Sequence, residues 1–191
     1  MITAILLAAG QSKRLKNENK LIKLFKKKLL INHILSSLIK SKVNKIIIVL
    51  GFEHLKVKKK LLKSKKIKFV INKNYKKGIS SSIKTGLRGL SKHNKGFLIV
   101  QGDMPNITKT TINKIILLIN KPGKEIFLPR FKNRIGNPIG FKKSMIKNIN
   151  KIKGDRGAKN IIKKNSKKIK FININSKSIL INFNTKKDFS S

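Results

Sequence analysis

The segment that decides the fold reads Ile2-Thr3-Ala4-Ile5-Leu6-Leu7-Ala8-Ala9-Gly10-Gln11-Ser12-Lys13-Arg14-Leu15. An apolar run of this length that ends at a glycine is typical of a buried strand in an α/β sheet. The loop after it lacks large side chains, so its backbone N–H groups can approach an anion closely. Arg14 and Lys20 supply two cations, and we therefore predict a phosphate-binding loop. A small-residue turn that only packs a helix against the sheet is the alternative.

This loop differs from both standard glycine-rich phosphate-binding fingerprints. The segment contains neither G-x-x-x-x-G-K-[ST] nor G-x-G-x-x-G. The difference disfavours a P-loop fold and a dinucleotide-binding fold. The two cations can still neutralise a triphosphate that is bound in another way.

Composition bounds the class of protein. A chain of 191 residues fits one domain, residues 1–191, with a sizeable core. The absence of cysteine excludes disulfides, zinc–thiolate sites and a thiol nucleophile. No basic region precedes the first apolar run, and no apolar stretch approaches the ~20 residues of a membrane span. We expect a cytoplasmic protein with no membrane partner.

The formal net charge of +42 would ordinarily suggest a nucleic-acid partner. The cations, however, are nearly all lysines, and they are spread along the whole chain beside abundant Ile and Asn. Clustered arginines with interleaved aromatic residues are missing, since the chain has five Arg, one Tyr and no Trp. We attribute the excess to A+T-rich codon usage and expect no specific nucleic-acid partner.

Strand-like and helical patterns alternate along the chain. Apolar residues recur at helical spacing in Leu30–Lys42, Lys109–Asn120 and Met145–Lys151. This alternation predicts an α/β fold of three layers, α/β/α, in which helices cover both faces of a Rossmann-like, mostly parallel sheet. Ligands bind such sheets beyond the carboxyl ends of the strands. The strand-like runs are Thr3–Ala8, Lys45–Leu50, Lys66–Ile71, Gly96–Gln101, Glu125–Pro129, Lys168–Ile174 and Ile179–Phe183.

A carboxylate follows one of these runs directly, in Gly102-Asp103-Met104-Pro105. At the carboxyl end of a central strand, and before a proline that fixes the turn, Asp103 is well placed to hold Mg²⁺ on substrate phosphates. Capping of the helix that begins near Thr108 is the alternative role for Asp103.

A hydroxyl-rich segment, Gly78-Ile79-Ser80-Ser81-Ser82, precedes another helical pattern. Hydroxyls and free N–H groups at a helix N-terminus suit an anion or a ribose. The alternative is a plain serine cap.

Three later segments carry further candidates. Gly136-Asn137-Pro138-Ile139-Gly140-Phe141 and Gly154-Asp155-Arg156-Gly157-Ala158-Lys159 are glycine-rich turns, which either face a second substrate or only connect elements. The segment Asn182-Phe183-Asn184-Thr185-Lys186-Lys187-Asp188-Phe189 offers amide carbonyls that can ligate Mg²⁺.

Together these segments resemble the MobA-like nucleotidyltransferases, in the same order and over nearly the whole chain. The first loop with Lys20-Leu21 resembles the family signature L-A-A-G-x-S-x-R-(x)n-K-L, and Gly102–Pro105 resembles its G-D-M-P. The serine segment resembles G-[MI]-S-S-S-[LI] of the MocA-like molybdenum cofactor cytidylyltransferases, whereas the guanylyltransferase branch usually has Gly-Pro-Leu there. The two turns resemble G-[NH]-P-x-x-[FV] and G-D-x-G-A-[RK]. The last segment departs from D-I-D-T-P-E-D-L, because Asn182 and Asn184 replace two acids.

The resemblance implies the fold of the nucleotide-diphospho-sugar transferases and a set of site residues. It assigns catalysis to Arg14, Lys20 and Asp103, and Mg²⁺ binding to Asp103, Asn182 and Asn184. It assigns acceptor binding to Asn137, Pro138, Asp155 and Arg156. The implied nucleotide contacts are Leu7, Ala8, Ala9, Gly10, Gln11, Ser12, Lys20, Ser80, Ser81 and Ser82.

The resemblance also implies a reaction. The phosphate of molybdopterin attacks the α-phosphorus of CTP and expels pyrophosphate, and a molybdenum hydroxylase receives the product. An ionised phosphate needs no general base, so catalysis amounts to positioning two anions and offsetting their repulsion. A GTP-dependent guanylyltransferase, or a transferase for another small phosphorylated acceptor, would share the same motifs. A carrier that delivers the cofactor to a molybdenum hydroxylase is the alternative of another class.

Overall fold

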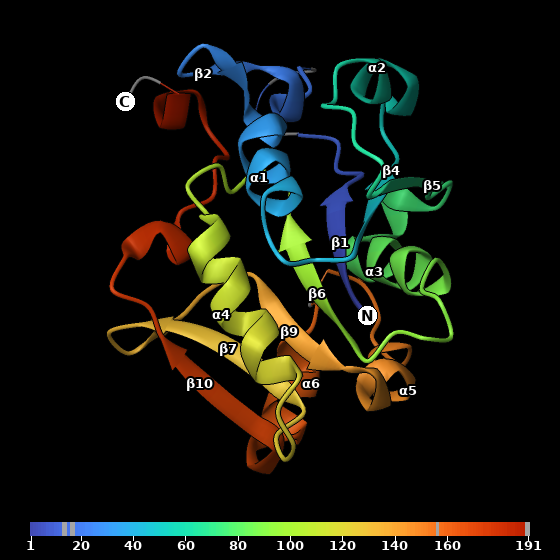
Figure 1. The fold of residues 1–191 in the computed structure, drawn as a ribbon. Helices are drawn as coiled ribbons and strands as arrows, with labels where there is room; N and C mark the ends of the chain where they lie inside the picture. Colours follow the sequence, from blue (N-terminus) through green and yellow to red (C-terminus); the bar gives the residue numbers. More distant parts are fainter. Residues whose placement is uncertain (13–14, 16–17, 156, 190–191) are drawn as a thin grey trace.

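A mixed sheet forms the centre of the computed structural model, which describes residues 1–12, 15, 18–155 and 157–189 (Figure 1). Its strands lie in the order β10-β7-β9-β6-β1-β4-β5, and β8 pairs with β7. A second, small sheet pairs β2 (Leu24–Phe25) with β3 (Lys28–Leu29). The strands of the main sheet are β1 (Ile2–Ala8), β4 (Lys45–Leu50), β5 (Ile67–Ile71), β6 (Gly96–Gln101), β7 (Ile126–Phe131), β8 (Arg134–Ile135), β9 (Ile139–Lys142) and β10 (Ile169–Asn173).

Helices cover both faces of the main sheet. On one face they pack over the even-numbered side chains of β1, such as Leu6, and on the other over the odd-numbered ones, such as Ile5, because side chains alternate along a strand. Figure 1 shows α1 and α4 together on the first face. The first face carries α1 (Leu30–Ile39), α2 (His54–Lys59) and α4 (Lys109–Ile119), and the second carries α3 (Ile79–Arg88), α5 (Ile146–Ile149) and α6 (Lys159–Lys164).

The predicted three-layer α/β fold with a mostly parallel sheet is confirmed. Strand β1 is parallel to its neighbours β4 and β6, β4 is parallel to β5, and β7 is parallel to β10. Among the helices that the structure describes, none is long and apolar enough to cross a membrane.

Strand β9 is an exception that the sequence pattern does not predict. It lies between β6 and β7 and is antiparallel to both. The strand has only four residues and contains Gly140, so neither its length nor its alternation marks it. The glycine is required by packing, because a Cβ there would lie 2.5 Å from Cγ2 of Ile115 in α4.

The predicted strand Ile179–Phe183 is wrong. Residues Lys177–Leu180 form a 3-10 helix, and an irregular segment follows. The backbone of this stretch bonds to loops instead of a strand: Phe183 donates its N–H to the carbonyl oxygen of Asp103 at 2.9 Å. The short helices α2 and α6 are also missed by the pattern, because lysines fill much of each six-residue helix.

Helix α3 approaches the sheet closely at Gly86. A Cβ at this position would lie 2.3 Å from Cγ2 of Ile5 in β1 and 3.1 Å from Cγ2 of Val49 in β4. The absence of a side chain at Gly86 therefore sets the distance between α3 and the two strands that lead to the candidate site.

We expect Gly86→Ala to lower the free energy of unfolding. Alanine gains about 1 kcal/mol in helix propensity over glycine, but overpacking a filled core typically costs about 1–3 kcal/mol. The new Cβ would clash with the Cγ2 methyl of Ile5 and lie tightly against that of Val49, so we expect a net loss of about 1 kcal/mol in urea denaturation. Arg88→Ala, on the exposed side of the same helix, is the matched control and should change stability by less than about 0.5 kcal/mol. A stabilised Gly86→Ala variant would contradict the close packing.

Candidate functional site

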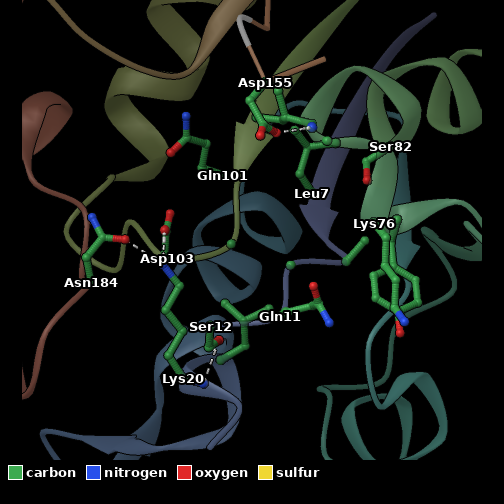
Figure 2. A pocket seen from close by; sticks show the side chains of 17 residues that line it. Leu7, Gln11, Ser12, Lys20, Lys76, Ser82, Gln101, Asp103, Asp155 and Asn184 are labelled. Atoms are coloured by element: carbon green, nitrogen blue, oxygen red, sulfur yellow. Dashed lines mark hydrogen bonds and ion pairs between the residues drawn. The ribbon is translucent and has the colours of Figure 1, made fainter. Parts of the chain in front are cut away.

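A cavity of about 450 Å³ opens beyond the carboxyl ends of β1 and β6 (Figure 2). The loop after β1 forms one wall and the start of α3 forms another. The turn after β6 and the segment near Asn184 complete it. This is the edge of the sheet where ligands of α/β folds bind.

The alternation of side chains along β1 decides which residues before the first loop face the cavity. Leu7, Ala9, Gly10, Gln11 and Ser12 line the cavity, whereas the side chain of Ala8 packs into the core on the opposite face. The loop is held by Phe52, which donates its N–H to the carbonyl oxygen of Ala9 at 3.2 Å. Four of the five predicted loop contacts and Leu7 thus lie at the cavity, and Ala8 does not.

Among the described residues, Lys20 is the cation that makes the most hydrogen bonds at the cavity. Its Nζ lies 2.5 Å from Oδ2 of Asp103, 2.8 Å from the carbonyl oxygen of Phe183 and 2.9 Å from Oδ1 of Asn184. Its backbone N–H donates to Oγ of Ser12 at 3.1 Å. Figure 2 shows Lys20, Asp103 and Asn184 pointing toward one another. Residues far apart in sequence therefore meet at one ammonium group.

Asp103 is placed by the pairing of β6 with β1. The N–H of Gly102 donates to the carbonyl oxygen of Leu7 at 3.0 Å, which fixes the turn that presents the carboxylate. The side chain is 14 % exposed, and its Oδ1 is buried without a hydrogen-bond partner among the described residues. Asp103 does not cap α4, because Thr108 does so by accepting the N–H of Thr111 at 3.2 Å. The capping alternative for Asp103 is therefore wrong.

The carboxyl-terminal turn selects one of the two predicted asparagines. Oδ2 of Asp188 accepts the backbone N–H groups of Asn184 and Thr185, each at 2.7 Å. These two bonds hold the pKa of Asp188 below its ordinary value. The turn directs Asn184 to Lys20, whereas Asn182 is exposed and does not line the cavity. Of the predicted metal ligands, the structure brings Asp103 and Asn184 together and leaves Asn182 outside.

The first N–H groups of α3 already have hydrogen-bond partners within the chain. Ile79 donates its N–H to Oδ1 of Asp155 at 3.0 Å, and Ser80 donates its N–H to the carbonyl oxygen of Gly154 at 3.1 Å. Gly78 allows this approach, since φ is 91° and a Cβ would lie 2.5 Å from Oδ1 of Asp155. The expectation that these N–H groups are free for an anion does not hold.

The three serines have different surroundings. Ser82 lines the cavity, whereas Ser80 and Ser81 do not. The single hydroxyl hydrogen of Ser81 is directed to its own loop, where the carbonyl oxygens of Gly78 and Asn74 lie 2.8 and 2.9 Å from Oγ. The hydroxyl of Ser82 accepts from Nδ2 of Asn72 at 3.0 Å, so it too is part of the turn that begins the helix.

Only one of the described acceptor residues lines the cavity. Asp155 does so, whereas Asn137 and Pro138 do not. Asn137 donates its N–H to the carbonyl oxygen of Ile179 and so joins the start of β9 to η6 (Lys177–Leu180). Arg14 and Arg156, two of the predicted cations, lie outside the described residues.

The cavity also contains residues that sequence reasoning does not select for the site, among them Tyr75, Lys76 and Gln101. Gln101 had a usable signal, because it is the last residue of β6 and directly precedes Gly102-Asp103. Tyr75 is brought in by Gly51, where a Cβ would lie 2.8 Å from the Cβ atoms of both Ala9 and Tyr75. Such long-range contact leaves no local signal in the sequence.

A small-residue loop, a lysine and a carboxylate surround one cavity at the carboxyl edge of a mostly parallel sheet, which is where α/β folds bind their ligands. The MobA-like NTP transferase domain family matches residues 4–169, so this chain belongs to that family. It is a nucleotidyltransferase of the MobA-like class.

Solved structures share the fold at low sequence identity. Rv0371c from Mycobacterium tuberculosis H37Rv superposes with a TM-score of 0.87 at 21% identity, over 99% of this chain and 95% of that one. Its complex with manganese gives 0.80 at 19% identity, over 99% and 96%. A nucleotidyl transferase from Methanothermobacter thermautotroptrophicus gives 0.84 at 18%, over 100% and 94%. The 4-diphosphocytidyl-2C-methyl-D-erythritol synthase of Anaerococcus prevotii DSM 20548 gives 0.80 at 18%, over 99% and 92%.

We expect the bond between Asp155 and Ile79 to stabilise the start of α3. A carboxylate that accepts an N–H at a helix N-terminus contributes about 1 kcal/mol, and less where water reaches it, as at the exposed Asp155. Asp155→Ala should therefore lower the free energy of unfolding by up to about 1 kcal/mol in urea denaturation. Asp155→Asn keeps an oxygen acceptor and should retain most of the stability. Equal losses in both variants would show that the charge, and not the hydrogen bond, stabilises this turn.

Proposed function

We propose that this chain transfers CMP from CTP to the phosphate of molybdopterin, in its molybdenum-loaded form, with release of pyrophosphate and with Mg²⁺ as the metal. The observation that carries the proposal is the meeting of Lys20, Asp103 and Asn184 beside the first loop. This arrangement supplies a cation for phosphates and oxygen ligands for a metal at one end of the same cavity.

The residues at this point fit a hard cation. The carboxylate of Asp103 has a buried oxygen, Oδ1, that accepts nothing from the described residues, and Asn184 contributes an amide carbonyl close by. Mg²⁺ prefers oxygen ligands and is often held by one or two carboxylates together with substrate phosphates. Among the described residues, no group of three or more His, Cys, Asp or Glu side chains is arranged to hold a metal ion. When bound, the ion would neutralise charge on the reacting phosphates.

The chain's own groups would position the two substrates. The backbone of the loop from Ala9 to Ser12 lies against the cavity, where its N–H groups can face a triphosphate, and Lys20 adds a positive charge. The acceptor phosphate is already ionised, so the site needs no general base. The work of the site is then to hold two anions in line despite their repulsion.

The choice of CTP rests on the first loop and on the serine segment, both of which resemble the cytidylyltransferase branch. A diphosphocytidyl compound is also the product named for the Anaerococcus synthase of the same fold. The manganese complex of Rv0371c supports a divalent metal in a protein of this shape. A guanylyltransferase, or a transferase for another small phosphorylated acceptor, is the second candidate, because both would use the same lysine and carboxylate.

The test is pyrophosphate release with Mg²⁺, molybdenum-loaded molybdopterin and each of the four nucleoside triphosphates in turn. We expect release with CTP and at least a 100-fold slower rate in Asp103→Ala, a loss typical of removing a group that stabilises charge in phosphoryl transfer. Glu125→Ala is the matched control, since Glu125 is also an ion-paired carboxylate but lies at the opposite end of the sheet, beside Lys168. Its rate should stay within about two-fold of the wild type.

Other outcomes identify the alternatives. Release with GTP and not with CTP would contradict the cytidylyl proposal and favour the guanylyltransferase. If none of the four nucleotides gives pyrophosphate, and tight molybdopterin binding survives Asp103→Ala, the result would favour a carrier that delivers the cofactor to a molybdenum hydroxylase.

A further inference from the structure

Three oxygen atoms of different chemical kinds converge on the Lys20 ammonium. They are a carboxylate oxygen of Asp103, the backbone carbonyl oxygen of Phe183 and the amide oxygen of Asn184, at 2.5, 2.8 and 2.9 Å from Nζ. An ammonium group has three hydrogens to donate, so these oxygens use its full capacity. Lys20 and Asp103 are 15 % and 14 % exposed, so little water is available to replace either partner.

The same oxygens form a typical ligand set for a hard divalent cation. Carboxylate, amide carbonyl and backbone carbonyl oxygens are the groups that bind such ions in proteins. The second oxygen of Asp103, Oδ1, is buried and accepts no hydrogen bond from the described residues, so it is free to accept a cation. The carbonyl of Phe183 adds a ligand that neither motif nor composition indicates.

We infer that the Lys20 ammonium occupies the divalent-cation site itself, so that Lys20 and the metal exclude each other at Asp103. The inference rests on the proposed metal site and adds the order of events by which a metal binds there. Lys20 must leave the three oxygens before a metal can use them. Two cations on the same oxygens would repel each other strongly, because the side chains of Lys20 and Asp103 are largely shielded from water.

The position of the Lys20 backbone shows where the released ammonium can go. Its N–H is bonded to the hydroxyl of Ser12, at the end of the first loop, so the base of the side chain stays beside the proposed triphosphate site. The flexible side chain can then move its charge from Asp103 to a phosphate while the backbone remains fixed. A triphosphate therefore helps the metal to bind, because it gives Lys20 another partner. By linkage, the metal helps the triphosphate to the same extent.

The experiment is a titration with Mn²⁺ in the absence of nucleotide, in which the electron paramagnetic resonance signal of the free ion gives the dissociation constant of the bound ion. Lys20→Met removes the ammonium and keeps an unbranched chain of similar length, and we expect it to bind Mn²⁺ at least ten-fold more tightly than the wild type. Lys76→Met is the matched control, because Lys76 lines the same cavity and has no bond to Asp103 among those that the structure describes. It reports the effect of removing one positive charge nearby, and its affinity should change by less than about three-fold.

Two further variants keep the test decisive. Adding Asp103→Asn to Lys20→Met should abolish the gain in affinity, which places the bound ion at Asp103. Lys20→Gln keeps a neutral donor for Asp103 and should show a smaller gain in the same direction. If Lys20→Met unfolds because Asp103 loses its partner, the Mn²⁺-dependent rise in melting temperature of Lys20→Gln, compared with the wild type, measures the same competition. Equal or weaker Mn²⁺ binding without the lysine would overturn the inference.

The outcome is separable from that of the proposed function. Tighter Mn²⁺ binding by Lys20→Met, together with no pyrophosphate release by the wild type with any nucleotide, would support the competition and reject the transferase proposal. Pyrophosphate release by the wild type, together with unchanged Mn²⁺ binding in Lys20→Met, would support the transferase and reject the competition. A combination of tighter metal binding and slower turnover in Lys20→Met is the result that we expect.

Discussion

The parallel pairing of β1 with β6 is the constraint on which the candidate site depends. The register places Leu7 opposite Gln101, so the two chains leave the sheet side by side at the same edge. The bond from the N–H of Gly102 to the carbonyl oxygen of Leu7 extends this pairing by one step beyond the strands. The loop that we propose for the triphosphate and the turn that carries Asp103 are therefore held together by two buried strands of the sheet, and not only by contacts between loops.

A cluster of aromatic rings holds the remaining parts of the site. Phe183 packs against Phe25 with 4.7 Å between ring centroids and against Phe189 with 5.4 Å. Phe25 belongs to β2, which follows Lys20 within a few residues, whereas Phe183 directly precedes Asn184. One small apolar cluster therefore fixes both the segment that delivers the ammonium and the segment that delivers its carbonyl ligands. Such a cluster can order the carboxyl-terminal segment although that segment adds no strand to the sheet.

The sequence predicts local features of this protein well and long-range ones poorly. The strands β4 and β6 are predicted to the residue, because strand burial follows from short-range patterns. The first loop and Asp103 line the same cavity, as the alternation of strands and helices predicts for two segments that follow the carboxyl ends of parallel strands. The choice of Asn184 over Asn182 could not be predicted. It depends on the bond from the Asn184 N–H to Asp188 and on the contact of Phe183 with another part of the chain.

The same limit explains the start of α3. A glycine and three serines before a helical pattern favour a free anion site by local rules. The structure shows that Asp155, 76 residues further along the chain, has taken the N–H of Ile79. Gly78 is compatible with both arrangements, since it provides room either for a ligand or for the loop at Gly154. Only tertiary contact distinguishes the two, and no local pattern encodes it.

The extreme charge of the chain gives the few acidic residues particular weight. Only six Asp and Glu residues occur beside 48 Lys and Arg, yet Asp103 and Asp155 both line the cavity and Asp188 orients Asn184. A net charge of +42 attracts polyanions such as nucleoside triphosphates and repels free divalent cations. Asp103, already paired with Lys20, has little capacity to offset that repulsion. A divalent metal would therefore enter more easily as a complex with the triphosphate, whose phosphates both cancel its charge and give Lys20 a new partner.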